Sequence, residues 1–572
     1  MRVNIIGNHK KNTGLAQDTH VLHGMIAHVL GKETEIRHIP HYYPQCPQAE
    51  VNVFIEVINP SLFAYAGKNV WVPNHEWTYQ TWEPYAQMVD EIWVKTHEGE
   101  KIFRDGWSLG DKVRYVGWTS IDKVQPEKKN YYKAIVPVGK NMWRNPKPII
   151  QAYMRIFQQD PSGFRNLPEL HIVYSPEHIR IPPIPDYLDA KIKMHGEVMK
   201  EADYDALLQE CGLCICMSAA EGFGHAINEA MSAGCVMMLS PIDAFRELTD
   251  NAIWVSNAKV TPHPSCLGVL EDIDVGSLVE ALHMYNASQL MWRRSMGNFC
   301  RSEYEERHTA FVKRMETVLG EWKDLPTYSL ESRLPKEEDM PKVSVITITK
   351  DRRAFIPLAK YCFLAQGYPE DKLEWVIVDD GKDQIKDLVS DLPNVKYVLC
   401  DEREGGWTIG AKRNLGVEKA SHDVLVMLDD DDVYPNNSLL TRVAFMLAGP
   451  EPKECTFCTT IPCFDIHEKK SFMNVPPMVM RMSDRVSEAT LCFTREFWKS
   501  RPFPDQQIAE AGAFIRGREY MCREVSPQDV IVSLTHKKTT SSRKAPPGES
   551  NGCHYGFQDE LYTLVCEIAD AI

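Results

Sequence analysis

The run Val424-Leu425-Val426-Met427-Leu428-Asp429-Asp430-Asp431-Asp432 joins an apolar segment to four consecutive aspartates. The apolar part has the length and aliphatic composition of a buried β-strand. Four carboxylates at its end repel one another strongly unless a bound cation neutralises them. Because carboxylate oxygens favour hard ions, the cluster predicts a site for Mg²⁺ or Mn²⁺. The alternative is a solvated acidic turn at the start of a helix.

Two earlier apolar runs also end in polar residues. Residues 342–352 read KVSVITITKDR, residues 375–381 read WVIVDDG, and GAKRNLG follows at 410–416. Short apolar runs of this kind predict parallel strands separated by helices. Ligands of such sheets bind beyond the carboxyl ends of the strands, so these polar residues are expected to lie around one site with the aspartates.

In their order and spacing these segments resemble the nucleotide-sugar glycosyltransferases of family two, which have the GT-A fold. The resemblance implies that Asp429 and Asp431 are the metal ligands of an Asp-x-Asp motif, with Asp432 as an alternate ligand. It further implies a donor-binding site of four residues, in which three contact the nucleoside and Arg413 faces the diphosphate. These residues are Thr349, Asp351 (where the family more often has Asn), Asp380 and Arg413.

Two residues further along complete the site that the resemblance implies. His536 ends a strand-like run and is expected to complete the metal site or to hold the diphosphate. Glu510 stands where the family has the base that deprotonates the acceptor hydroxyl, and Asp505 is a rival. An inverting transfer needs one such carboxylate within hydrogen-bond reach of the attacking hydroxyl.

A second motif lies in the amino half, where residues 218–234 read SAAEGFGHAINEAMSAG between two strand-like runs. A glycine turn that opens a helix presents free amides to a diphosphate, and a carboxylate two turns later can reach ribose hydroxyls. The segment resembles the retaining glycosyltransferases of family four, which have the GT-B fold. The resemblance assigns Glu229 to the ribose, and it assigns the donor sugar and phosphates to Glu221, Gly222, Phe223 and Gly224.

Other parts of the amino half fit the same resemblance. Lys140 follows the apolar run IVPVG, and the resemblance implies that it and a second cation hold the leaving diphosphate. Lys147 is the expected second cation, but it lies farther along the chain than the family spacing, so Arg144 is a substitute for it. Gly14 permits a close backbone approach to the donor. His75 is expected to contact the sugar.

Composition narrows the class of protein. The chain has 572 residues, 44% of them hydrophobic, and a formal net charge of −15, which argues against nucleic acid or an anionic membrane surface as a partner. No run has the length of a membrane-spanning helix, so the expected location is cytoplasmic. The 16 cysteines are expected to be reduced thiols. A zinc site at Cys455, Cys458, Cys463 and His467 is the less favoured interpretation, because these residues read more readily as strands.

The predicted fold class is α/β, with a GT-B unit over 1–322 (lobes about 1–130 and 131–322), a linker over 323–341 and a GT-A domain over 342–572. Few contacts are expected across the linker, so the two units should fold separately. The predicted function is a bifunctional glycosyltransferase that uses nucleotide-sugar donors and a glycan acceptor, with a metal-dependent, inverting carboxyl half and a metal-independent, retaining amino half. The alternatives are one active half with an acceptor-binding module and, more distantly, a nucleotidyltransferase. For the amino half a nicotinamide oxidoreductase is also conceivable, but a Gly-x-Gly-x-x-Gly turn is missing.

Overall fold

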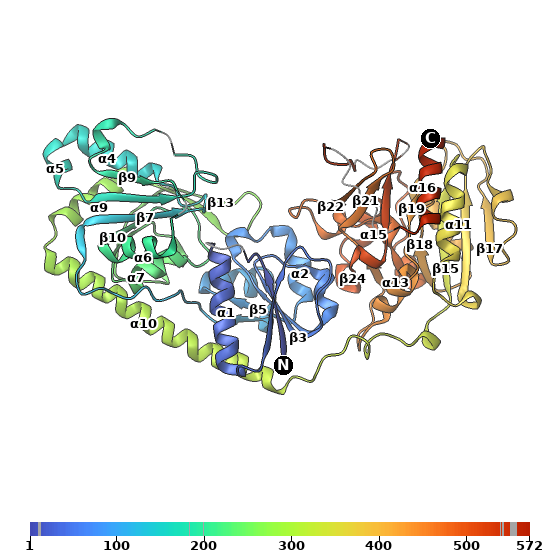
Figure 1. Cartoon of the computed structure of the whole chain (residues 1–572), viewed down its shortest axis with the longest axis horizontal. Coiled ribbons are helices and arrows are strands. Elements are labelled where there is room, and N and C mark those ends of the chain that lie inside the picture. The colour runs from blue at the N-terminus through green and yellow to red at the C-terminus, as the bar shows by residue number, and fades with distance from the viewer. Residues whose placement is uncertain (10–12, 182, 198, 538, 540–542, 549–556) are drawn as a thin grey trace.

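Figure 1 shows the chain in a computed structural model. The structure describes residues 1–9, 13–181, 183–197, 199–537, 539, 543–548 and 557–572. Among these residues no helix combines the length and the apolar character that a membrane span needs.

The first sheet of the amino half is parallel throughout, with the strand order β2-β1-β3-β4-β5-β6. Its strands are almost wholly buried in the middle of the sheet, as expected where helices cover both faces. The strands are β1 (Arg2–Gly7), β2 (Glu35–Pro40), β3 (Ala49–Ile55), β4 (Ala66–Val72), β5 (Glu91–Val94) and β6 (Val113–Tyr115). The helices are α1 (Gly14–Leu30), α2 (Glu83–Met88) and α3 (His97–Lys101).

The second sheet is also parallel, with the order β12-β11-β10-β7-β8-β9. Its strands are β7 (Asn130–Gly139), β8 (Glu169–Tyr174), β9 (Ile192–His195), β10 (Cys211–Cys216), β11 (Val236–Leu239) and β12 (Ala252–Trp254). Its helices are α4 (Lys147–Gln159), α5 (Pro161–Asn166), α6 (Glu201–Glu210), α7 (His225–Ser232), α8 (Asp243–Arg246) and α9 (Val275–Ala287). A hairpin of β13 (Asn257–Pro262) and β14 (Val269–Ile273) extends from this lobe.

The long helix α10 (Leu290–Gly320) connects the two lobes of the amino half (Figure 1). It runs from the second lobe back to the first, where Phe311 and Met315 join the core that contains Val3 and Val51. Just beyond it, Trp322 is buried and stacks on Trp93 with 5.3 Å between the ring centroids. Two parallel sheets tied together in this way confirm the predicted GT-B unit.

The carboxyl half is built around a seven-stranded sheet of order β17-β16-β15-β18-β23-β20-β24 and a four-stranded sheet of order β19-β25-β21-β22. The three predicted strands are β15 (Val343–Thr349), β16 (Leu373–Asp379) and β18 (Val424–Met427), adjacent and parallel, with β15 in the middle. This arrangement confirms the α/β domain expected of a GT-A fold.

The remaining strands of this half are β17 (Val395–Leu399), β19 (Asp432–Val433), β20 (Cys455–Phe457), β21 (Ile461–Asp465), β22 (Lys470–Asn474), β23 (Cys492–Thr494), β24 (Cys522–Glu524) and β25 (Val532–Thr535). Its helices are α11 (Ile356–Leu364), α12 (Ile409–Lys419), α13 (Ser438–Leu447), α14 (Arg495–Ser500), α15 (Glu510–Ile515) and α16 (Asp559–Ala571). Cys455 and Cys463 lie in β20 and β21, as the strand interpretation of that segment predicts. The described cysteines are free thiols.

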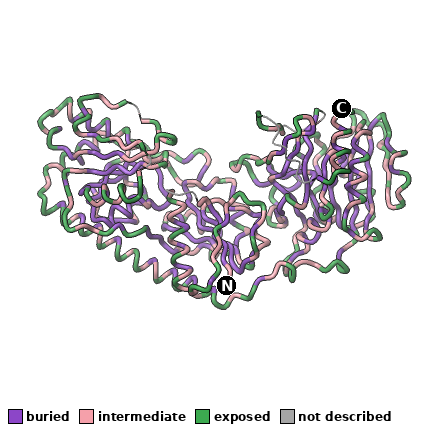
Figure 2. The backbone as a smooth tube through the Cα atoms, in the orientation of Figure 1, coloured by how far each residue is buried: buried purple, intermediate pink, exposed green. Residues whose placement is uncertain are grey.

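The two halves touch each other directly, and here the expectation of few contacts was wrong. The Trp82 indole donates to the carbonyl of Met478 at 2.9 Å, and Arg485 donates to the Tyr85 hydroxyl at 3.0 Å. Tyr85 and Arg485 are both buried, so the contact belongs to the interior. Figure 2 shows that buried residues fill the middle of each lobe and that exposed residues lie around them. The composition of the connecting segment carries no information about the surfaces that pack beside it. The linker over 323–341 and the separate folding of the two units stay predictions.

Candidate functional sites

The aspartate run lies at the carboxyl end of β18, in the loop that leads to β19. Asp429, Asp431 and Asp432 each place a carboxylate oxygen within 4.8 Å of the others, and they form the one metal-type group of three among the described residues. Three convergent carboxylates present the hard oxygen ligands that Mg²⁺ and Mn²⁺ prefer. The chemistry of these residues therefore fits the predicted ion.

His536 and Arg352 both contact Asp431. The His536 Nε2 lies 3.1 Å from Asp431 Oδ2, and the Arg352 guanidinium donates to the same oxygen at 2.5 Å. Burial by itself would raise the pKa of Asp431, but the bonds from His536 and Arg352 lower it below its ordinary value. The structure thus brings His536 to the predicted metal ligand.

The other two members of the run are tied to neighbouring strands. Asp430 accepts from the Thr349 hydroxyl at 2.6 Å and from Arg352 at 2.9 Å. Asp432 accepts from the Ser533 hydroxyl at 2.8 Å, at the start of β25. Burial and the nearby Asp431 raise the pKa of Asp430 to about 7 and that of Asp432 to about 8. These bonds fix the loop between the two sheets. Arg352 is a residue that sequence reasoning did not assign, although it belongs to the turn that carries the resemblance.

The predicted nucleoside residues lie at the ends of β15 and β16. Asp351 has a φ of +51° and accepts from the backbone N–H groups of Lys382 and Asp383, which lower its pKa. Asp380 binds the Lys412 ammonium at 2.7 Å, a contact that sequence reasoning missed. Thr349 is buried, and its hydroxyl is engaged by Asp430. The structure gathers these side chains at one edge of the sheet, and their contacts to a donor stay predictions.

Glu510 is the first residue of α15 and is buried. Its Oε1 accepts from Arg413 Nε at 2.9 Å, and the same guanidinium lies 3.2 Å from Asp429 Oδ1. Burial opposes the charge of Arg413, but Asp429 and Glu510 outweigh it and raise the pKa of Arg413. Arg413 therefore joins the predicted base to the predicted metal ligand, and its contact to a diphosphate stays a prediction. The rival Asp505 is exposed and binds Thr408 and Arg403 at 2.5 Å each.

A further carboxylate near this base was not predicted. Glu488 lies in a short 3-10 turn, Glu488–Thr490, and burial together with the charge of Glu510 raises its pKa to about 7. A lone glutamate in a loop carries no sequence signal of such proximity.

In the amino half, Glu221 begins the glycine turn between β10 and α7. It accepts from the Arg144 guanidinium at 2.6 and 3.1 Å, and from the Ser218 hydroxyl at 3.1 Å. Burial opposes the charge of Arg144, and Glu221 outweighs it, so that the pKa of Arg144 is raised. Arg144, the predicted substitute for Lys147, is thus bound to the carboxylate assigned to the donor.

Glu229 lies in α7, where the first lobe meets the second. Gln17 of α1 donates to Glu229 at 2.5 Å, and the Lys123 ammonium lies 3.8 Å away. Burial is the main cause of the raised pKa of Glu229. Gly14, at the start of α1, is close to this contact, since a Cβ there would lie 3.7 Å from the ring of His225.

Lys140 directly follows β7, Lys147 is the first residue of α4, and both are exposed. Within the described residues neither ammonium group makes a hydrogen bond or ion pair. Gly222, Phe223 and Gly224 are buried in the turn. The donor-binding roles of all five stay predictions.

His75 and Glu221 line the same pocket, which is open to solvent. His75 is buried, and its Nε2 lies 3.3 Å from Glu98 Oε2. Burial lowers the pKa of His75, but the bond to Glu98 outweighs this effect and raises it. The sequence-based pairing of these two residues at one site is consistent with this geometry.

Comparison with known families decides the assignment of both regions. The model of Glycosyl transferase family 2 matches residues 344–465, which include the aspartate run, and the model of Glycosyl transferases group 1 matches residues 168–263, which include the glycine turn. The chain combines two glycosyltransferase regions.

The similar proteins carry related names. An uncharacterized glycosyltransferase of Haemophilus influenzae is 28% identical over 114 residues, 19% of this chain and 44% of its own length. Glycosyltransferase AglE of Haloferax volcanii is 30% identical over 115 residues, 19% of this chain and 36% of its own length. The chain thus spans less than half the length of these curated relatives. Among solved structures, a mannosyltransferase of Pyrobaculum calidifontis in complex with GDP-Man and Mn²⁺ is 20% identical, with a TM-score of 0.28 over 38% of this chain and 63% of its own.

Proposed function

We propose that the chain is a bifunctional glycosyltransferase that moves sugars from nucleotide-sugar donors to a glycan acceptor in the cytoplasm. The observation that carries the proposal is the position of Glu510, which Arg413 joins to the aspartate cluster at the carboxyl ends of the central strands. A base beside a metal-type cluster has the parts that transfer from a nucleotide sugar requires.

In the carboxyl half, Asp429, Asp431 and His536 would hold Mn²⁺ or Mg²⁺. When bound, the ion stabilises the negative charge of the leaving diphosphate. Glu510 accepts the proton of the acceptor hydroxyl, and its ion pair with Arg413 holds the carboxylate in place for that task. The side of the sugar opposite the diphosphate is attacked, so the transfer inverts the configuration.

The contacts of the two carboxylates favour Glu510 over Asp505 as the base. Glu510 is buried and connected to Asp429 through one guanidinium, whereas Asp505 is exposed and bound to Arg403. A base must lie within hydrogen-bond reach of the attacking hydroxyl, and the link through Arg413 to Asp429 supports that position for Glu510.

In the amino half the transfer would be retaining and independent of metal. Glu229 would accept from ribose hydroxyls, and the turn from Glu221 to Gly224 would hold the sugar and phosphates. Lys140 and the free amides at the start of α7 would stabilise the leaving diphosphate in place of an ion.

One observation favours a second candidate, in which the amino half binds the acceptor and does not catalyse transfer. Arg144 is bound to Glu221, and both lysines are exposed, so the turn has less buried positive charge than a diphosphate site usually has. The two candidates are distinguished by a chain whose carboxyl half is inactivated. Such a chain releases nucleoside diphosphate if the amino half catalyses transfer, and it does not if the amino half only binds the acceptor. A nucleotidyltransferase would instead consume a nucleoside triphosphate.

The proposal is tested on the full chain with excess EDTA and then with Mn²⁺ restored. In a Glu229→Ala variant, assayed at a donor concentration too low for the weakened amino half, the remaining transfer belongs to the carboxyl half, and EDTA should stop it. In an Asp431→Asn variant the remaining transfer belongs to the amino half, and EDTA should leave it unchanged. Full activity of the Glu229→Ala variant in EDTA would contradict the assignment of a metal ion to the carboxyl half.

A further inference from the structure

The pocket of the amino half is strongly acidic. Its lining includes four carboxylate residues besides Glu221, contributed by the first lobe, by α8 and by the β13–β14 hairpin: Glu76, Glu98, Asp243 and Glu271. His75 is the one lining residue of basic type, and no lysine or arginine of the described chain lines the pocket. The pocket therefore offers acceptors of hydrogen bonds and repels anions.

Glu76 is distinct from the other acidic residues of this lining. Its side chain is 6% exposed, and its Oε2 is buried without a hydrogen-bond partner among the described residues. An unsatisfied buried carboxylate oxygen is costly, and a hydrogen bond from a ligand hydroxyl would remove that cost. Burial, with the nearby carboxylates of Glu221 and Glu56, raises the pKa of Glu76 to about 7.

The backbone of the glycine turn makes room for Glu76. A Cβ added to Gly222 would lie 2.3 Å from Glu76 Oε2, so the carboxylate occupies the space that any side chain at this position needs. Glu76 thus brings an acceptor from the first lobe to the turn that the second lobe contributes. A donor sugar placed at this turn meets the carboxylate.

The pocket is suited to hydroxyl groups and not to a metal ion. The described residues form a metal-type group of three only at the aspartate run of the carboxyl half, so the carboxylates of this pocket do not converge as ligands. A sugar hydroxyl, in contrast, needs one acceptor at hydrogen-bond distance, which Glu76 supplies.

We propose that Glu76 selects the sugar in the amino half: its free oxygen accepts from a sugar hydroxyl, and with its acidic neighbours it excludes sugars that carry a carboxylate. The inference rests on the proposed function, because it requires a nucleotide-sugar donor at the glycine turn. Like charges placed face to face oppose binding, and this repulsion provides the discrimination.

The experiment measures donor binding by calorimetry on the full chain at pH 9, above the raised pKa of Glu76, with Asp431→Asn and EDTA present to silence the carboxyl half. The probes are UDP-glucose with UDP-glucuronate, and GDP-mannose with GDP-mannuronate. We expect the neutral donor of the accepted pair to bind about 10- to 100-fold more tightly than its acidic counterpart. Glu76→Gln should reduce this ratio about tenfold, because an amide no longer repels the uronate and can donate to it.

Two more variants keep the test decisive. Glu280→Gln changes an exposed glutamate of α9 and should leave the ratio unchanged. Gly222→Ala displaces the Glu76 carboxylate without removing it, and it should weaken the neutral donor about tenfold even if Glu76→Gln fails to fold. The inference alone would be overturned if neutral and acidic donors bound equally. It would also be overturned if neither Glu76→Gln nor Gly222→Ala changed the ratio of their affinities. Failure of every donor to bind would overturn the proposed function of this half and the inference with it.

Discussion

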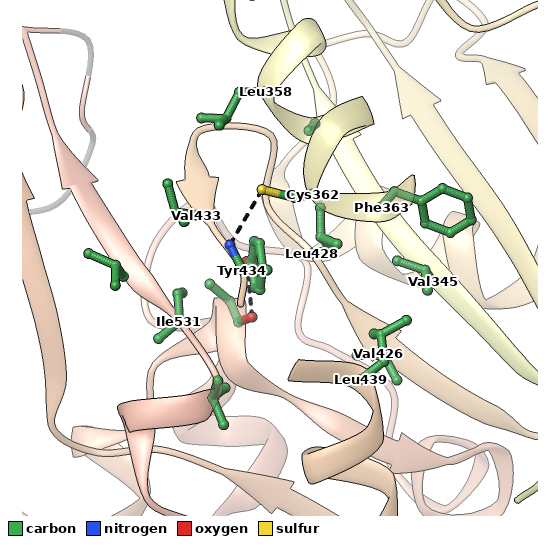
Figure 3. Close-up of a cluster of buried hydrophobic side chains, with 14 of the residues drawn as sticks. Val345, Leu358, Cys362, Phe363, Val426, Leu428, Val433, Tyr434, Leu439 and Ile531 are labelled. Carbon is green, nitrogen blue, oxygen red and sulfur yellow. Dashed lines mark hydrogen bonds between the residues drawn. The ribbon is translucent and has the colours of Figure 1, made fainter. Parts of the chain in front are cut away.

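The Tyr434 hydroxyl accepts a hydrogen bond from the backbone N–H of Asp429 over 2.8 Å. The same hydroxyl donates to the carbonyl of Ala489 at 3.2 Å, beside Glu488. Tyr434 is buried among apolar side chains, and its own N–H lies 3.5 Å from Cys362 Sγ (Figure 3). One phenol therefore fixes the start of the aspartate run and ties it to the loop near the base.

Tyr434→Phe should weaken metal binding, because Asp429 loses the bond that holds its backbone in place. Groups that orient a metal ligand are worth about 10- to 100-fold in metal affinity. The backbone N–H of Asp429 loses its partner and the Ala489 carbonyl keeps, among the described residues, only the 3.4 Å bond from Arg442, so the free energy of unfolding should also fall by about 1–3 kcal/mol. Calorimetric titration with Mn²⁺ and urea unfolding measure the two effects.

Tyr361→Phe is the matched control, since its hydroxyl makes only a 3.4 Å contact to Gln558 at the surface. It should change neither quantity. Equal Mn²⁺ affinity of Tyr434→Phe and the native chain would remove Tyr434 from the group of residues that position the site.

Glu510→Gln should abolish transfer by the carboxyl half while donor binding persists. The amide cannot take the proton of the acceptor, so the rate should fall about 10²- to 10⁴-fold. The measurement compares the transfer rate with donor affinity in the presence of Mn²⁺, in the Glu229→Ala background. Asp505→Asn is the control, because Asp505 is exposed and bound to Arg403. A larger loss in the control than in Glu510→Gln would reverse the assignment of the base.

Much of the carboxyl site was predictable because its residues occupy the ends of strands. Apolar runs that end in polar residues predicted β15, β16 and β18, and parallel strands bring their carboxyl ends to one edge. The pairing of Arg352 with Asp430 and Asp431 was not predictable in the same way. It depends on the direction of one long side chain, which residue order does not determine.

The amino half shows the same limit on a larger scale. Helix α10 runs from the second lobe to the first, and a helix pattern in a sequence does not tell which sheet the helix packs against. Glu76 was missed because a glutamate after His75 carries no pattern; only the folded chain places it over Gly222. The contact of Tyr85 with Arg485 also joins surfaces 400 residues apart in sequence.

The ion pair of His75 and Glu98 should give a pH-dependent contribution to stability. The folded pKa of His75 is raised above its unfolded value of about 6.5, so the folded state binds the proton more tightly. The contribution is fully present below the unfolded pKa and is lost as pH rises through the folded pKa. Glu98→Gln should therefore destabilise the chain more at pH 6 than at pH 9, as measured by urea unfolding.

Glu100→Gln serves as the control for this pair. Glu100 contacts His97 at 3.0 Å, but that histidine is 65% exposed, and surface pairs contribute little. Its effect should be small and the same at both pH values. A Glu98→Gln effect that does not change with pH would show that the proton on His75 makes no difference to folding.

Glu229→Ala should weaken donor binding in the amino half and leave transfer by the carboxyl half unchanged. Ribose hydroxyls lose a charged acceptor worth roughly 1.5–3 kcal/mol, so donor affinity should fall about 10- to 100-fold. Gln17 and Lys123 lose their partner at the same time, which loosens the contact between α1 and α7. Glu229→Gln separates the two effects, because it keeps an acceptor for Gln17 and removes only the charge. Glu280→Ala, on the exposed face of α9, should bind donor normally. Calorimetry with EDTA present decides the matter, and an unchanged affinity of Glu229→Ala would take this residue out of the donor site.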